Sequence, residues 1–181
     1  MRQIAKTLTV CCILAGCVSD CPVAAQDAKP PSERSKLRVG TFDSRLIATA
    51  YVRSEAFKQR LAKMQADLKE AKASGEEKLV KQLEAEGPAL QDLIHKQGFS
   101  TWPVHDILQR IKAEIPGIAV KADVDMIVSK WDVVIQRNGA ETVDVTDLLV
   151  APFTPDEETR KILDSLRRTD PIPVEKLKKH D

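Results

Sequence analysis

Residues 44–77 read SRLIATAYVRSEAFKQRLAKMQADLKEAKASGEE, and this stretch decides the predicted fold. Its apolar positions recur at intervals of four and three residues, at Phe57, Leu61, Met64, Leu68 and Ala71. Such spacing places the side chains in one narrow stripe on a helix, with charged and amide residues between them. Over several turns, a stripe this narrow favours a helix–helix seam. For any single turn, an ordinary amphipathic helix is an equally good interpretation.

A second apolar stripe follows, at Leu79, Leu83, Leu90 and Ile94. The turn between the two helices lies either at Gly75 or at Gly87-Pro88, because glycine and proline both interrupt helices. The acidic pair Glu76-Glu77 suits the positive end of a new helix, which favours Gly75 and leaves the second position as a kink. The sequence therefore predicts an antiparallel, coiled-coil helical hairpin over about residues 44–100.

Short strands flank this helical region. Leu37 to Phe42 alternates apolar and polar residues, which is typical of a half-buried strand, and Asp43 or Ser44 can cap the following helix. Two further strands are predicted at 125–129 and 131–136, followed by a turn around Asn138-Gly139. Residues 143–150 have the pattern of a strand end that leads into a short helix.

Two more helices complete the predicted order. One runs from about Pro103 to Ile115 and is ended by Pro116-Gly117. The other covers 156–168, with Ile162, Leu163 and Leu166 on one side, and residues 154–181 thus form a C-terminal amphipathic helix and a loose tail. The predicted fold class is α+β, a small β body that carries a long helical hairpin.

The first 25 residues are typical of an export signal. Arg2 and Lys6 precede a short apolar stretch, Thr7 to Gly16, that is too short to span a bilayer. Cleavage is predicted either before Cys17, whose context Leu-Ala-Gly-Cys resembles a lipoprotein signal and would make Cys17 the lipidation site, or after Ala25. We therefore expect an exported protein of the periplasm or cell envelope, which the first of these two cleavage sites would anchor through lipid.

Composition excludes several classes of site and partner. All four cysteines, at positions 11, 12, 17 and 21, lie within the predicted signal, so the mature domain has no disulfide and no cysteine-based metal site. Without residues 1–25 the basic and acidic side chains are equal in number, which argues against nucleic acid as a partner. Residues 26–36 are polar, contain Pro30-Pro31 and are predicted to be a flexible spacer.

The order of signal, strand, helical hairpin, paired strands and helix resembles the Skp/OmpH family of periplasmic chaperones. Three segments carry the resemblance: Leu37 to Asp43, His105 to Ile111, and Asp125 to Ser129 with Val143 to Asp147. The resemblance covers residues 37–153 as one OmpH-like domain. Compared with the family, the predicted arms are short and the mature chain is close to neutral.

This resemblance implies a function as well as a fold. It implies a homotrimer whose arms enclose unfolded or outer-membrane protein clients, holding them without ATP as a holdase chaperone. Weak, multivalent and reversible binding is consistent with an exported protein that has no nucleotide motif. The alternative is a structural or adaptor lipoprotein whose hairpin docks one folded partner.

No residue pattern predicts an enzyme, a cofactor site or a metal site. The histidines are His95, His105 and His180, and they are expected to be solvated or to face a partner because their spacing does not suit one metal ion. Asp123, Asp125 and Asp132 lack the glycine-containing loop of an EF-hand. Asp144 and Asp147 are interpreted as a strand end and a helix cap around Thr146.

Four aromatic or apolar residues and one basic run have two interpretations each. Trp102 and Trp131 are expected in the core rather than at an interface. Phe57 and Met64 are expected in the helix seam rather than in contact with a client. The basic run Lys176 to His180 is expected to be solvated rather than bound to anionic lipid.

Overall fold

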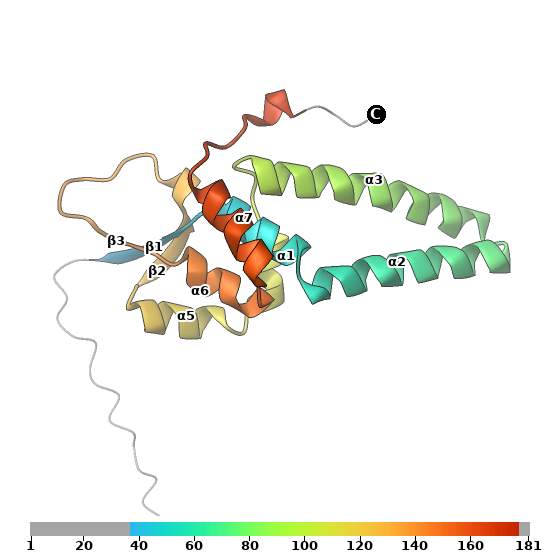
Figure 1. Ribbon diagram of the computed structural model, residues 1–181, viewed down its shortest axis with the longest axis horizontal. Helices are drawn as coiled ribbons and strands as arrows, with labels where there is room; N and C mark the ends of the chain where they lie inside the picture. Colours follow the sequence, from blue (N-terminus) through green and yellow to red (C-terminus); the bar gives the residue numbers. More distant parts are fainter. Residues whose placement is uncertain (1–36, 178–181) are drawn as a thin grey trace, which may run out of the picture. The chain divides into compact units, whose positions relative to one another are not determined.

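A three-stranded parallel sheet organises residues 37–177, the part of the chain that the computed structural model describes (Figure 1). The order of its strands is β2-β1-β3, so β1 is central. Gly40 of β1 lies opposite Ile127 of β2 and Val143 of β3. A Cβ atom at Gly40 would lie 3.2 Å from side-chain atoms of Ile127, Val124 and Val145, which explains glycine at this position. The strands are β1 (Arg38–Phe42), β2 (Met126–Ser129) and β3 (Glu141–Asp144).

The strands predicted at 37–42 and 125–129 are confirmed, but the strand predicted at 131–136 is wrong. The chain instead forms the short 3-10 helix η2 (Lys130–Asp132) and then a loop. The third strand is β3, which pairs in parallel with β1 and not with β2. Because β2 and β3 are separated by β1, the expected pairing of adjacent closing strands does not occur.

The long coiled-coil hairpin predicted over 44–100 is also wrong. This region forms three helices of 9, 20 and 23 residues, and the first of them is buried within the body. The apolar stripe is interrupted at Ser54, whose hydroxyl accepts a hydrogen bond from Phe57 N and begins a new helix. The fold class is therefore corrected to a mixed α+β fold with a parallel sheet and helices of moderate length. The three helices are α1 (Ser44–Val52), α2 (Glu55–Ser74) and α3 (Glu77–Phe99).

The predicted break at Gly75 is confirmed. Gly75 follows α2 in the left-handed conformation, with φ of 74°, and its N–H donates to Ala71 O. Pro88 lies inside α3, so the second candidate break does not end the helix. Lys72 and Glu84 form an ion pair of 2.8 Å between α2 and α3, which lie side by side (Figure 1).

The helix predicted from 103 to 115 is divided, and Pro116-Gly117 begins a helix rather than ending one. Proline suits this position because the first turn of a helix does not need its N–H.

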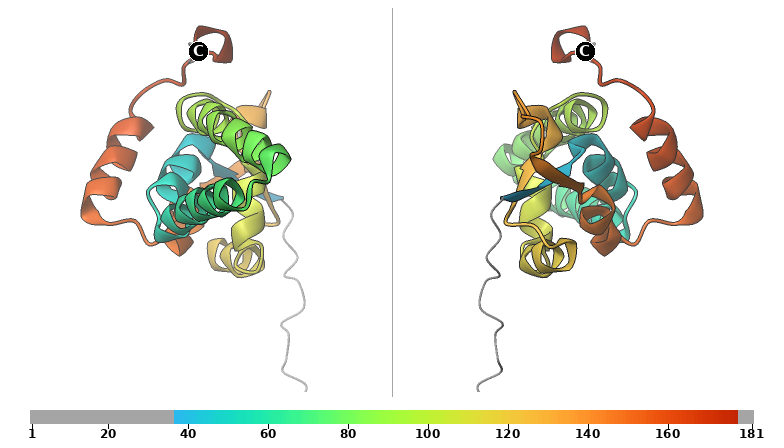
Figure 2. Two further views of the ribbon diagram at one scale, coloured as in Figure 1. Left: turned by 90° about the vertical axis from the view of Figure 1, so that its right-hand side faces the viewer. Right: turned by 90° about the vertical axis from the view of Figure 1, so that its left-hand side faces the viewer.

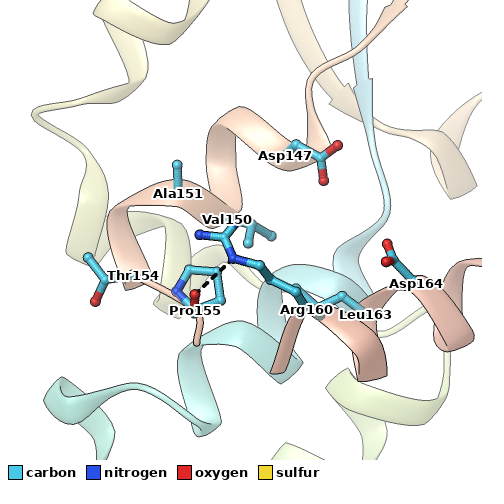
Figure 3. A pocket seen from close by; sticks show the side chains of 8 residues that line it. All are labelled: Asp147, Val150, Ala151, Thr154, Pro155, Arg160, Leu163 and Asp164. Carbon is cyan, nitrogen blue, oxygen red and sulfur yellow. Dashed lines mark hydrogen bonds between the residues drawn. The ribbon is translucent and has the colours of Figure 1, made fainter. Parts of the chain in front are cut away.

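The helix predicted over 156–168 is confirmed as α7 (Glu157–Arg167), which packs against α1 (Figure 2). A cavity lies between α7 and the segment before it (Figure 3). The remaining elements are α4 (His105–Leu108), η1 (Gln109–Ile111), α5 (Ile115–Ala122), α6 (Thr146–Val150), η3 (Ala151–Phe153), α7 (Glu157–Arg167) and η4 (Val174–Lys176).

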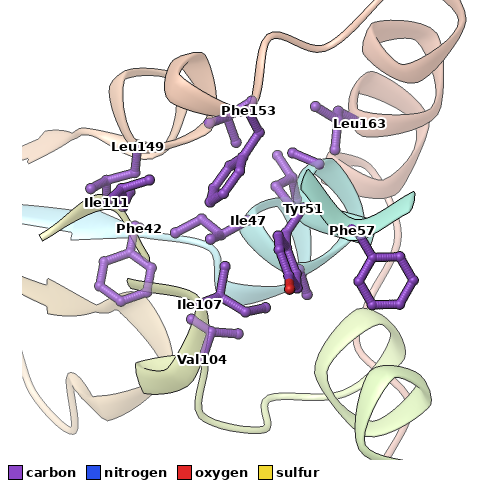
Figure 4. Packing of buried hydrophobic residues seen from close by; sticks show 14 of the residues in the cluster. Phe42, Ile47, Tyr51, Phe57, Val104, Ile107, Ile111, Leu149, Phe153 and Leu163 are labelled. Carbon is purple, nitrogen blue, oxygen red and sulfur yellow. The ribbon is translucent and has the colours of Figure 1, made fainter. Parts of the chain in front are cut away.

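The hydrophobic core is built around α1 (Figure 4). Leu46 and Ile47 are fully buried, and burial of each side chain contributes about 1.5–3 kcal/mol. Tyr51 packs edge-on against Phe57 at 5.2 Å and against Phe153 at 5.7 Å between ring centroids. These contacts join α1 to the start of α2 and to η3, so α1 is a core helix and not part of an arm.

The segment after α7 is attached to the body. Arg45 Nη1 donates to Thr169 O at 2.8 Å, and Ile172 N donates to Phe99 O at 2.8 Å. The loose tail expected here is therefore held in place at least as far as Ile172. Within residues 37–177, no helix combines the length and the apolar character that crossing a membrane requires.

Candidate functional site

The carboxyl ends of the three parallel strands bring together a cluster of charged residues. Asp43 follows β1, Lys130 follows β2, and Thr146 follows β3 after one residue. Asp43 Oδ2 lies 2.7 Å from Lys130 Nζ, and Asp43 N donates to Thr146 Oγ1 at 3.0 Å. In parallel sheets this edge is where ligands commonly bind, so the cluster is a candidate site.

Arg45 completes this cluster. Its side chain is 1% exposed, and its Nε and Nη2 atoms donate to the two carboxylate oxygens of Asp43 at 3.1 and 2.8 Å. Burial alone would raise the pKa of Asp43, but hydrogen bonds from Arg45 and Lys130, and their charges, lower it below its usual value. Trp131 packs beside both cations, with its ring centroid 5.1 Å from Arg45 Cζ and 4.3 Å from Lys130 Nζ.

The Asp43 carboxylate is paired with both cations of this cluster, and Arg45 also bonds Thr169 O, so we interpret the cluster as a structural link between the strand ends and the C-terminal segment. Sequence reasoning identified Asp43 only as a helix cap, a role that the structure confirms through its bond from Arg45 N. The pairing with Lys130 and Thr146 was missed. Its only signal in the sequence is that a polar residue closely follows each strand.

An apolar groove lies between α2 and α3 and has a volume of about 490 Å³. Its lining residues are Phe57, Leu61, Met64, Gly87, Pro88, Leu90, Gln91, Ile94 and His95. Phe57 and Leu90 form its buried base, Met64 and Ile94 are half-buried, and Leu61 is 39% exposed. Met64 and Phe57 therefore line a groove in addition to packing in the helix seam.

The groove exists because α3 presents small residues opposite α2. Gly87 has no side chain, and a Cβ atom built there would meet no atom within 4 Å. Pro88 adds only a short ring. The apolar stripe of α2 is consequently covered only in part by its neighbour, which leaves apolar surface around Leu61 that a partner can bury. Sequence reasoning had interpreted Gly87-Pro88 as either the turn between the helices or a kink.

The histidines and aspartates considered above as metal ligands do not form a common site within residues 37–177. Asp125 Oδ2 accepts a hydrogen bond from Arg38 N at 2.8 Å, and Asp123 pairs with the Arg38 guanidinium. His95 lies at the groove, with its ring 5.8 Å from that of Phe99, while His105 begins α4. Across residues 37–177 no group of three or more histidine, cysteine, aspartate or glutamate side chains is placed to hold a metal ion.

The two tryptophans do not belong to the buried core. Trp102 is 38% exposed, and its ring centroid lies 5.3 Å from Lys96 Nζ, so the core interpretation is wrong for this residue. Trp131 is half-buried within the charged cluster. Asp144 Oδ1 accepts from Thr146 N at 2.8 Å, as the strand-end interpretation predicted.

Several predictions fall on residues outside the described range. These are Cys17 with both cleavage sites, the spacer at 26–36, and His180 with the end of the basic run. No family model, no curated protein and no solved structure matches this chain.

Proposed function

We propose that this protein is a non-enzymatic, ATP-independent holdase of the cell envelope that binds apolar segments of unfolded or membrane-protein clients in the groove between α2 and α3. The observation that carries the proposal is the apolar surface that α2 and α3 leave incompletely covered between them. Leu61, Met64 and Ile94 remain accessible in a groove of about 490 Å³ whose base, Phe57 and Leu90, is already packed.

The chemistry of the groove fits many partners rather than one. Aliphatic residues and the flexible thioether of Met64 adapt to side chains of different shapes, as is typical of promiscuous binding surfaces. The groove has few polar groups to fix the orientation of a ligand, Gln91 and His95 being its polar lining residues. Such a surface binds weakly and reversibly, as a holdase must if it releases its client without ATP hydrolysis.

The predicted export signal and the motif resemblance to the Skp/OmpH chaperones support the same proposal. A client in transit across the envelope exposes apolar segments, and a groove that covers them would limit aggregation. The corrected fold removes the long arms from this picture. The binding surface that remains is the groove itself.

Leu61→Glu tests the proposal. A urea-unfolded outer-membrane barrel protein is diluted with and without the purified protein, and light scattering follows its aggregation. Suppression by the wild type is expected, and Leu61→Glu is expected to weaken it at least about tenfold, because a carboxylate in the groove would lose its hydration when a client binds. Leu61 is 39% exposed, so the variant should fold normally.

Gln65→Glu is the matched control, since it places the same side chain at an exposed position of α2 outside the groove. It should suppress aggregation as the wild type does. Equal suppression by Leu61→Glu, or none by the wild type, would contradict the holdase proposal. Capture of one folded envelope protein in a fixed ratio, with no effect on unfolded clients, would instead support the adaptor function.

A further inference from the structure

The cavity between α6, η3 and α7 has a volume of about 460 Å³ and is separate in its lining from the groove of α2 and α3 (Figure 3). This size is at the small end of the range for ligand sites in proteins. Its apolar part includes Val150 and Leu163, which are 4% and 5% exposed. A ligand in this cavity therefore meets apolar side chains as well as the polar groups around them.

Arg160 supplies a positioned cation to the cavity. Its Nε donates to Pro155 O at 3.1 Å, which fixes the guanidinium against the chain before α7. Its two Nη groups form no hydrogen bond and no ion pair with any of residues 37–177. Two parallel N–H donors in this arrangement match the two oxygens of a carboxylate.

Two carboxylates also line the cavity. In Figure 3, the carboxyl groups of Asp147 and Asp164 lie on one side of the Arg160 guanidinium, and Thr154 lies on the other. Asp147 is already paired with Arg167, while Asp164 has no ion-pair partner among the described residues. Arg160 and Asp164 are four residues apart with the cation first, the less favourable order for a pair on one helix.

The backbone at Thr154 is strained. Thr154 has φ of 49°, a left-handed conformation that a β-branched residue rarely adopts and that costs about 1–2 kcal/mol. This conformation follows η3 and directly precedes Pro155, whose carbonyl holds Arg160. Strain of this kind is concentrated at binding sites.

We propose that this cavity binds the zwitterion of a free α-amino acid with an apolar side chain. The α-carboxylate pairs with the Nη groups of Arg160, the α-ammonium lies toward Asp164 and Asp147, and the side chain packs against Val150 and Leu163. A simple carboxylate would leave Asp164 without a counter-charge, and a simple amine would leave Arg160 without one. Only a ligand with both charges is matched at both ends.

Isothermal titration calorimetry of the purified protein with L-leucine tests this inference. Saturable binding of one leucine per chain is expected. N-acetyl-L-leucine, which lacks the ammonium, and L-leucine amide, which lacks the carboxylate, are each expected to bind at least about tenfold more weakly. Absence of leucine binding up to about 10 mM, or equal binding of either blocked analogue, would overturn the proposal.

Arg160→Gln is expected to weaken leucine binding at least about tenfold, and Arg168→Gln is the matched control. Arg168 lies at the end of the same helix outside the cavity, and its removal changes the net charge equally. Circular dichroism shows whether each variant is folded, and Asp164→Asn gives a second test from the opposite end of the cavity. Unchanged affinity in both Arg160→Gln and Asp164→Asn would overturn the assignment. The aggregation assay is independent of this result, because the groove and the cavity share no lining residue.

Discussion

Asp43 has two structural roles that depend on different parts of the chain. It caps α1 through a bond from Arg45 N, which is a local role, and it pairs with Lys130, which comes from the end of β2. The side chains of Asp43 and Arg45 are 4% and 1% exposed, so solvent screens their pair very little. Loss of the carboxylate would leave Arg45 buried without its main partner.

Asp43→Asn is expected to lower the free energy of unfolding by about 3 kcal/mol at neutral pH. The pKa of Asp43 is lower in the folded protein than its ordinary value, so its ionised form stabilises the fold above an unfolded-state pKa of about 3.9. That contribution disappears as the pH falls through the folded-state pKa. Urea unfolding followed by circular dichroism should therefore show a large gap between wild type and variant at pH 7 that narrows in strong acid.

Asp156→Asn provides the comparison for this experiment. Asp156 caps α7 by accepting from Thr159 N, and it is exposed and away from the buried cluster. Its substitution should cost less than that of Asp43. A gap between wild type and Asp43→Asn that stays constant from neutral pH to strong acid would refute the linkage to this carboxyl.

At the scale of the helices and strands, local pattern identified some elements and failed at others. The alternation at 37–42 and the amphipathic helix at 156–168 are confirmed, because each is specified by residues close in sequence. The break at Ser54 was missed because Ser54 occupies a position that fits the helical spacing, so its role as a cap was hidden.

Long-range pairing was not predictable in the same way. β1 and β3 meet across 103 residues, as the bond between Asp43 and Thr146 shows. No local pattern specifies whether such strands are parallel. The groove and the cavity are likewise products of packing, because each combines residues of two or more elements. Nothing in the sequence indicates that Gly87 lines the groove or that Arg160 lines the cavity.

Gly75→Ala tests the turn between α2 and α3. A Cβ atom at Gly75 would meet nothing within 4 Å, so its effect comes only from the left-handed φ of 74°. The substitution is expected to destabilise the protein by about 1 kcal/mol, measured by urea unfolding.

Gly117→Ala is the matched control for this experiment, with the opposite expected sign. Gly117 is exposed within α5 and a Cβ atom there would meet nothing within 4 Å, so alanine is favoured over glycine by about 0.5–1 kcal/mol. A stabilising effect of Gly75→Ala would show that the turn does not require the left-handed conformation.

At the scale of the whole molecule, the sheet leaves surface that is suited to assembly. β2 and β3 are both edge strands among the described residues, and their outer edges present unpaired backbone groups. Met126 on β2 is 45% exposed, and Val134 and Ile135 in the following loop are 97% and 81% exposed. Open strand edges and exposed apolar side chains are each typical of a surface that another chain covers.

The homotrimer implied by the family resemblance therefore stays a prediction with a physical basis in this surface. Light scattering after size exclusion is expected to give three times the mass of one chain. Val134→Glu with Ile135→Glu should shift that mass to a single chain, because burial of two new carboxylates opposes association. Val120→Glu alters a similarly exposed valine on α5 and should leave the trimer intact. A wild-type protein with the mass of one chain would remove the trimer, and the α2–α3 groove of each chain would then have to hold its client alone.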